Sequence, residues 1–201
     1  ALDTEEREVY DALVNGVSEH LDSQTLPDGT TVVADAPISP EAIWAALIQL
    51  QNVEVNGREV GRASGYNVVV PAGTKDFIEY ALNRTIISVQ DGLVTYGPGD
   101  MSALANISVV ETGYLTGTQW IVLPKPNAIR RPVLELLRLR GYEAPELRVQ
   151  ANAGNYLGGG VVAPFEGDFE ADEIAMRVRF VAGGVLWDDR FAVISDGDGT
   201  P

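Results

Sequence analysis

The segment from Asp172 to Val181 alternates between apolar and other residues, and this alternation constrains the fold more than any other feature of the chain. Successive side chains of a β-strand point to opposite faces, so the pattern predicts a half-buried strand. Gly183-Gly184 follows, a pair typical of two-residue hairpin turns, and residues 185–194 are predicted to return as the partner strand. The apolar face carries Ile174, Met176, Val178 and Phe180, and the opposite face carries Ala175, Arg177, Arg179 and Val181.

Three helices are predicted in the first half of the chain. Apolar residues at helical spacing predict an amphipathic helix over residues 4–21. Ser39 is a favourable N-cap and Pro40 suits the first helical position, so a second helix is predicted to run from there to Gln51. Thr74 is predicted to cap a third helix that carries the apolar residues between 77 and 82.

Strands are predicted between and after these helices. Residues 67–70 read as a buried strand ended by Pro71, and residues 85–123 as strands separated by Gly-containing turns, most clearly at 107–111 and 119–123. Helix, strand and helix in close order predict a mixed α/β lobe around a central sheet. Pro124-Lys125-Pro126 predicts a lobe boundary, residues 131–140 a short helix, and residues 151–165 a glycine-rich loop.

The composition excludes several classes of function. Fourteen basic residues against 29 acidic ones give a net charge of −15, which disfavours nucleic-acid binding through bulk electrostatics. The same acidity suits a soluble protein, a salt-rich environment or a genome that encodes Arg in preference to Lys. There is no cysteine, so disulfides and thiolate metal sites are ruled out, and no apolar run approaches the roughly 20 residues that span a bilayer.

No catalytic, cofactor-binding or metal-binding residue is predicted. His20 is the single imidazole, and at the end of the first predicted helix it is expected to interact with the helix dipole and solvent. Asp196 and Asp198 lack the further oxygen ligands of a calcium loop. The acidic run 166–173 is interpreted as a solvated or intersubunit face rather than a catalytic carboxylate pair. The chain is therefore not expected to be an enzyme.

Two segments carry a family resemblance. In 165–184 a Phe and an Asp lead into the Arg177-x-Arg179 strand and a Gly-Gly pair, and the chain then runs on to Ser195-Asp196-Gly197. This order, together with residues 137–149 and the glycine-rich loop, resembles the major capsid proteins of tailed viruses, which have the Hong Kong 97 fold. Encapsulin shells share that fold and are a close alternative.

The resemblance implies an α+β chain of the Hong Kong 97 type, with an axial α/β lobe and a peripheral lobe of spine helix plus long β-hairpin. Residues 1–35 would form the distal spine helix and a turn, 36–123 the axial lobe, and 124–201 the return to the peripheral lobe with a C-terminal β-hairpin. The amino-terminal arm and extended hairpin usual in the family are not found ahead of the spine helix. Either the chain is a cleaved or partial product, or the virus uses a reduced subunit.

The implied function is that of a self-assembling structural subunit of an icosahedral head. It would form hexamers and pentamers with itself, meet scaffold, portal and head-completion proteins, and enclose double-stranded DNA without binding it specifically. It would assemble in the host cytoplasm and reside in the virion, with no cofactor and no membrane. Rival readings are another virion structural or decoration protein and, from a different class, a carboxylate-dependent hydrolase.

Five charged residues are candidates for contacts between subunits: Arg177, Arg179, Arg190, Asp188 and Asp189. The two strand arginines share a face, and Arg190 is expected to lie near them on the return strand. A guanidinium pairs with a carboxylate in bidentate geometry, which suits a fixed contact to a neighbouring copy. Ordinary pairing within one chain is the alternative.

Overall fold

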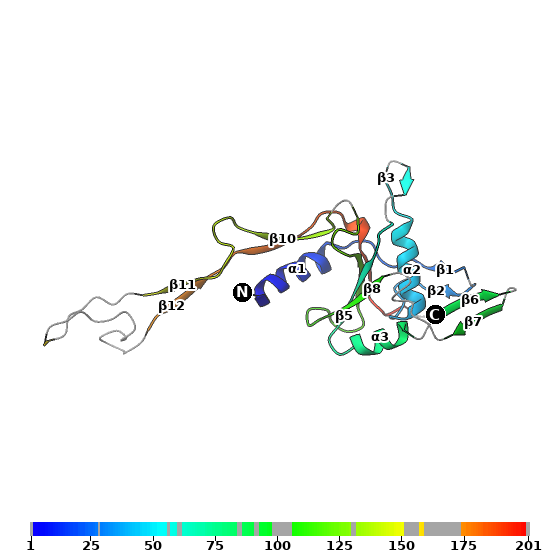
Figure 1. Cartoon of the computed structure of the whole chain (residues 1–201), viewed down its shortest axis with the longest axis horizontal. Helices are drawn as coiled ribbons and strands as arrows, with labels where there is room; N and C mark the ends of the chain where they lie inside the picture. Colours follow the sequence, from blue (N-terminus) through cyan, green and yellow to red (C-terminus); the bar gives the residue numbers. More distant parts are fainter. Residues whose placement is uncertain are drawn as a thin grey trace.

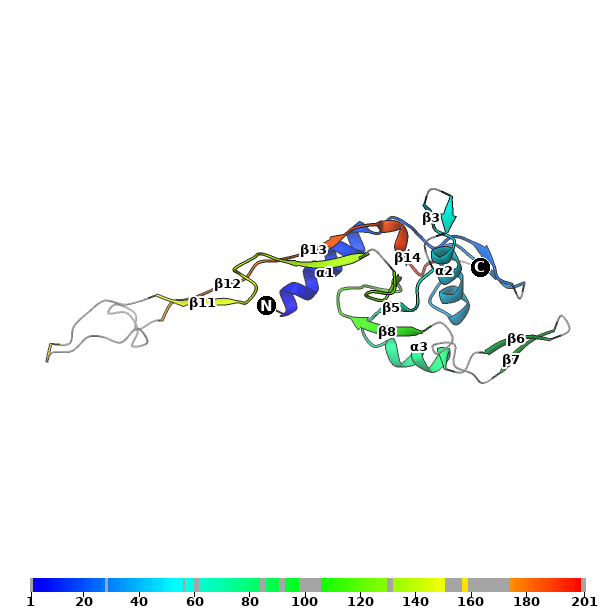
Figure 2. The same ribbon diagram turned by 45° about the horizontal axis from the view of Figure 1, so that its top comes forward.

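The structure consists of a body built around a central sheet and a long two-stranded arm that projects from it (Figures 1 and 2). It is a computed structural model that describes residues 2–27, 29–55, 57–59, 62–83, 86–90, 93–97, 106–129, 132–150, 157–158 and 174–199. Most of the glycine-rich loop 151–165 and the whole acidic run 166–173 lie outside the described residues, so the interpretations placed on them remain predictions.

A four-stranded sheet in the order β14-β9-β5-β8 forms the centre of the body. β5 (Tyr66–Pro71) pairs in parallel with β8 (Ile107–Thr112) and antiparallel with β9 (Trp120–Pro124). β9 also pairs antiparallel with β14 (Val193–Ser195). The strands predicted at 67–70, 107–111 and 119–123 are confirmed, and the mixed helix and sheet content confirms an α+β chain.

Both faces of the inner strands β5 and β9 are buried, which explains why these two strands are nearly continuous apolar runs, whereas the edge strand β8 also carries exposed residues. α2 (Pro40–Gln51) and α3 (Lys75–Leu82) cover one face, where Val68, Val70 and Trp120 pack against the helices. The C-terminal end of α1 (Leu2–Gly16) covers the other face, packing Leu13 and the following Val17 against alternate residues of the same strands.

Short two-stranded elements surround the body. They are the pairs β1 (Gln24–Thr25) with β2 (Thr31–Val32), β3 (Glu54–Val55) with β4 (Arg58–Glu59), and β6 (Ile86–Gln90) with β7 (Leu93–Gly97). A turn of 3-10 helix, η1 (Asp189–Phe191), precedes β14. Across the described ranges, none of the helices combines the length and the hydropathy that crossing a membrane takes.

The arm is a two-stranded ribbon along its whole described length, made of two strand pairs that follow one another. Near the body, β10 (Leu134–Arg138) pairs with β13 (Ala182–Leu186); farther out, β11 (Glu146–Val149) pairs with β12 (Met176–Arg179), both antiparallel. The pair β10–β13 lies along α1, whereas β11 and β12 extend beyond the N-terminal end of that helix (Figures 1 and 2). We call the β11–β12 pair the outer ribbon.

Two predictions about the arm are wrong. Residues 131–140 do not form a helix, because β10 pairs with β13 over its whole length, and this long-range pairing outweighs the local helix propensity of Leu, Glu and Arg. The strand around 172–181 does not turn at Gly183-Gly184 to pair with residues 185–194. Those glycines lie inside β13, and the partners of β12 and β13 come from residues 134–149 instead.

The ends of two other elements also differ from prediction. The first helix ends at Gly16 rather than at residue 21, so the chain reaches His20 in an extended connection. Residues 185–194 are divided among the end of β13, the 3-10 turn η1 and the start of β14. The last of these strands belongs to the central sheet of the body.

Candidate functional site

The outer ribbon has two chemically different faces, because cross-strand partners share a face and the register alternates. Glu146 lies opposite Arg179 and Arg148 opposite Arg177, which makes one face predominantly cationic. The other face pairs Leu147 with Val178 and Val149 with Met176. We call these the cationic face and the apolar face of the ribbon. The alternation predicted for residues 172–181 is therefore confirmed over Met176–Arg179, the part that forms a strand.

Neither face is covered within the described chain. Leu147, Met176 and Val178 on the apolar face are 63%, 58% and 65% exposed, so the prediction of a half-buried strand is wrong for this chain by itself. Exposed apolar side chains gathered on one face of a soluble protein usually mark an interaction site. The outer ribbon is thus the part of the described molecule best suited to contact a partner.

The cationic face has few partners of its own. Arg148 donates twice through Nη2 to its strand neighbour Glu146, at 2.9 and 3.0 Å. Arg179 places its guanidinium carbon 4.6 Å from the ring centroid of Tyr142, a cation–π contact. The side chain of Arg177 forms no ion pair or hydrogen bond with any described residue.

The other three candidate residues lie outside the ribbon. Arg190 belongs to η1 and forms a bidentate pair with Asp188, at 2.9 Å from Nε and 2.8 Å from Nη2. Hydrogen bonding to that carboxylate raises the pKa of Arg190. Asp189 accepts a hydrogen bond from Ser18 Oγ at 2.5 Å. The expectation that Arg190 lies beside Arg177 and Arg179 is wrong. Arg190 belongs to η1, and the partner of β12 is β11.

α1 fixes the base of the arm to the body. A Cβ built on Gly184 would lie 2.8 Å from Val9 Cα and 2.9 Å from Ala12 Cβ, so only glycine lets the helix approach β13 this closely. Glu5 accepts two hydrogen bonds from Arg138 on β10, at 2.5 Å from Nε and 2.9 Å from Nη2. This ion pair raises the pKa of Arg138 and links the start of α1 to β10, the partner strand of β13.

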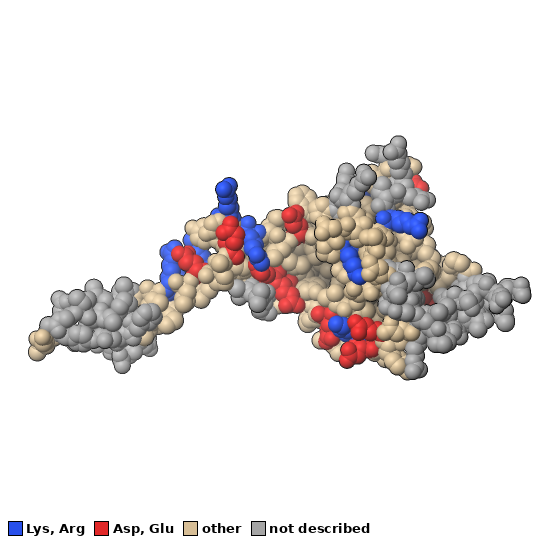
Figure 3. Space-filling model, viewed as in Figure 1, with Lys and Arg blue, Asp and Glu red and all other residues tan. Residues whose placement is uncertain are grey.

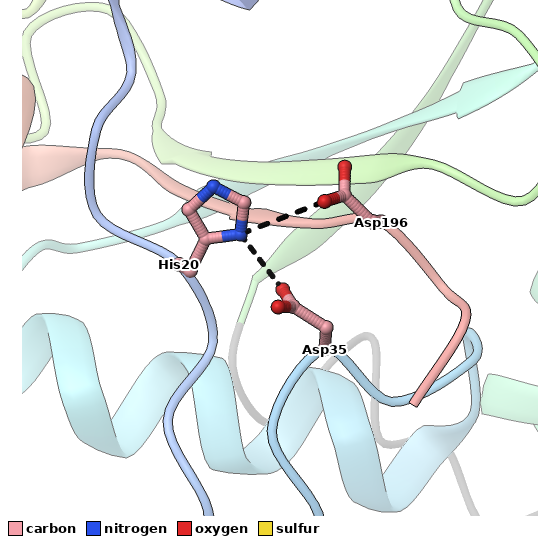
Figure 4. A group of neighbouring side chains, drawn as sticks. All are labelled: His20, Asp35 and Asp196. Atoms are coloured by element: carbon pink, nitrogen blue, oxygen red, sulfur yellow. Dashed lines mark hydrogen bonds and ion pairs between the residues drawn. The ribbon is translucent and has the colours of Figure 1, made fainter. Parts of the chain in front are cut away.

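A second polar cluster holds the far end of the α1 connection. His20 Nδ1 lies 2.9 Å from an Asp35 carboxylate oxygen and 3.9 Å from one of Asp196, and Figure 4 shows both carboxylates facing this one ring nitrogen. The hydrogen bond to Asp35 raises the pKa of His20 above 6.5, burial opposes this, and the charges of Asp35, Asp196 and Asp198 add to it. The expected interaction of His20 with a helix end is wrong, since α1 ends at Gly16.

The same cluster offers one ligand atom from each of its three residues, all within 4.8 Å of one another. Its imidazole Nδ1 lies 2.9 Å from the Asp35 carboxylate oxygen, so these side chains contact one another directly. The arrangement therefore works as an ionic clasp between the connection after α1, the loop before α2 and the segment after β14. Sequence reasoning singled out His20 and Asp196 but missed Asp35, because no local pattern signals a contact across 15 residues of irregular chain.

Comparisons with known proteins agree with this architecture. A family model described as phage capsid protein matches residues 1–195. A solved chain from Mycobacterium phage Che8 aligns over 98% of this chain with a TM-score of 0.50 and 16% identity, a level that shows a shared fold alone. This chain spans 60% of the length of that phage chain. No curated protein matches the sequence.

The family match covers nearly the whole chain, from its first residue to the end of β14. Capsid proteins are structural components of the virion, not enzymes, and they act by assembling into a shell. The chain belongs to the phage capsid protein family.

Proposed function

We propose that the chain is the major capsid protein of a tailed virus, the repeated subunit of an icosahedral shell that encloses double-stranded DNA. Its subunits form hexamers and pentamers, and scaffold, portal and head-completion proteins are the further partners that such a shell requires. The observation that carries the proposal is the outer ribbon, a projecting element whose apolar face is left uncovered by the residues that the structure describes.

The physical argument starts from the instability of a lone ribbon. A two-stranded pair is marginal in water, and it gains stability when a further layer packs on it. Burying the exposed parts of Leu147, Met176 and Val178 would contribute about 1–2 kcal/mol each. In a shell of identical copies, neighbouring subunits supply that cover many times over in one geometry.

The Hong Kong 97 lobes are part of the same proposal. Residues 36–123 form the axial lobe, and residues 1–35 and 124–201 form the peripheral lobe of spine helix and long hairpin. In support, α2, α3 and three strands of the central sheet fall within or next to the axial range, and α1 runs along the β10–β13 pair of the arm. β14 returns from the peripheral range to the central sheet, which locks the two lobes together.

The charge of the chain fits a DNA container. With a net charge of −15, the inner wall of the shell would repel phosphates rather than hold them, so DNA would be packed without being gripped.

The test replaces the apolar face of the ribbon. Leu147, Met176 and Val178 are all changed to Thr, and a matched variant carries Ile at the same positions, so both sets keep β-branched residues. Electron microscopy and sedimentation of the purified chain should show shells for the natural sequence and the Ile variant, and mostly unassembled subunits for the Thr variant. Shells of normal yield from the Thr variant would refute the role of the ribbon. A natural chain that forms no particles, either alone or together with its scaffold protein, would refute the proposed function.

A further inference from the structure

The cationic face of the outer ribbon is unusual in so acidic a chain. Among the described residues of the ribbon it presents Arg148, Arg177 and Arg179 with a single carboxylate, Glu146, although the whole chain carries a net charge of −15. Arg148 and Arg177 lie directly opposite each other, and like charges in that position destabilise a strand pair unless a carboxylate lies close. The face therefore calls for an acidic partner in addition to Glu146.

The outer surface of α3 has the complementary chemistry. Asp76 and Glu79 lie one helical turn apart, with Lys75 3.8 Å from Glu79 as the one nearby cation on the helix. Phe77 and Tyr80, also one turn apart, are 71% and 56% exposed, although both are large aromatic residues on a helix that could have buried them. In Figure 3 acidic side chains gather over α3, and the arm carries basic side chains with acidic ones among them.

The rest of α3 holds this surface firmly in place. Ile78 and Leu82 are 2% and 0% exposed and anchor the helix on the central sheet. At the start of the helix, Thr74 Oγ1 donates to the carbonyl of Pro71 at 2.7 Å, and Glu111 of β8 accepts from Gly73 N at 2.5 Å.

We propose that the cationic face of the outer ribbon of one copy docks on the outer surface of α3 of a second copy. This rests on the proposed function, since it names the surface that the ribbon meets in the shell. Guanidinium groups pair with carboxylates and stack on aromatic rings, so arginines on the ribbon match both kinds of residue on α3. The ribbon and α3 lie on separate parts of one molecule, so the contact joins two copies (Figures 1 and 2).

Other pairings of these surfaces are less favourable. Two ribbons meeting through their cationic faces would oppose arginines, and two α3 helices would oppose carboxylates. The ribbon-to-α3 contact is heterologous, which means that each copy offers a different surface to each neighbour, and such contacts close into rings. DNA phosphate is the other ligand that arginines attract, but phosphate binding gives no role to the exposed aromatic pair of α3.

The experiment reverses charge on each side. One variant carries Arg177→Glu and Arg179→Glu, another carries Asp76→Arg and Glu79→Arg, and a third combines all four. We expect each two-site variant to lower the yield of assembled particles at least tenfold, and the four-site variant to recover at least half of the natural yield. Mixing the two two-site variants should also restore assembly, because the altered ribbon then meets the altered helix and the natural surfaces meet each other.

Control variants reverse the same number of charges elsewhere. Arg7→Glu with Arg62→Glu, and Asp11→Arg with Glu54→Arg, change exposed residues outside both surfaces and should leave the yield within twofold of the natural chain. Particles from the natural chain without recovery in the four-site variant would overturn this inference and leave the proposed function standing. Intact particles from the ribbon variant with less DNA inside would also overturn it, in favour of phosphate binding.

Discussion

Replacing Gly184 with Ala tests whether close packing of α1 on β13 sets the base of the arm. The added Cβ would lie 2.8 Å from Val9 Cα and 2.9 Å from Ala12 Cβ, and it would also meet the carbonyl oxygen of Glu8. Carbon atoms in good contact are about 3.5–4.0 Å apart. Two of the opposing atoms belong to the helix backbone and cannot rotate away, so α1 has to move off the strand by something under about 1 Å.

The expected loss of stability follows from two opposing effects. Overpacking a close contact costs about 1–3 kcal/mol. Removing a glycine restricts the unfolded chain and returns about 0.4–1 kcal/mol. The net loss should be about 1–2 kcal/mol, which for a chain of this size lowers the unfolding midpoint by about 2–8 °C. Part of that loss should appear locally, as faster exchange of the α1 amides.

Gly183 provides a matched control one residue away. A Cβ at Gly183 would meet no atom within 4 Å, and neither glycine has a positive φ, so both substitutions have the same backbone cost. Denaturant unfolding followed by tryptophan fluorescence, on subunits kept unassembled, would compare the two. We expect Gly183→Ala to be neutral or slightly stabilising. Equal stability of the two alanine variants would refute the packing argument.

Three further changes test other contacts. His20→Gln should lower the unfolding midpoint more at pH 5.5 than at pH 8.5. Because the pKa of His20 is raised in the folded chain, the protonated imidazole stabilises the fold fully at pH values below the unfolded-state pKa of about 6.5. This stabilisation is lost as the pH rises through the folded-state pKa. For so exposed a pair the difference should be about 1–2 °C, and equal shifts at both pH values would contradict the clasp. Glu5→Gln should speed amide exchange in β10, since Arg138 loses its carboxylate; unchanged exchange would count against this tie. Trp120→Phe should cost about 1–3 kcal/mol in denaturant unfolding, because it opens a cavity and removes the 3.1 Å hydrogen bond from Nε1 to Ala36 O, whereas a neutral result would show that the site repacks.

Elements whose signals are local were predictable from the sequence. Ser39 caps α2 as expected, accepting a hydrogen bond from Ala42 N at 3.0 Å, and Pro40 begins the helix. Thr74 precedes α3 as expected, but its hydroxyl bonds to the carbonyl of Pro71 instead of capping the helix with its side chain. The inner strands β5 and β9 of the central sheet were recognisable because both of their faces are buried, which leaves nearly uninterrupted runs of apolar residues.

Features that depend on distant partners were not predictable. Leu134 to Arg138 has the composition of a helix and becomes a strand only because residues 182–186 lie beside it. The sequence likewise could not show that Gly184 meets a helix from the other end of the chain, so a packing glycine looked like a turn glycine. For the candidate site, the alternation of Arg177 and Arg179 with apolar residues was visible, but the opposing strand with Arg148 was not.

The amphipathic outer ribbon connects the folding of the subunit to its assembly. The inner part of the arm is stabilised by α1, which packs on β13 and binds β10 through Glu5, but β11 and β12 extend past the end of that helix. A two-stranded ribbon with both faces in water has little stability of its own. If a neighbouring subunit covers the ribbon as proposed, that contact would supply the free energy that holds it in one conformation. A subunit would then present its complete binding surface only next to a neighbour, which would favour growth at the edge of an existing assembly over association of free subunits.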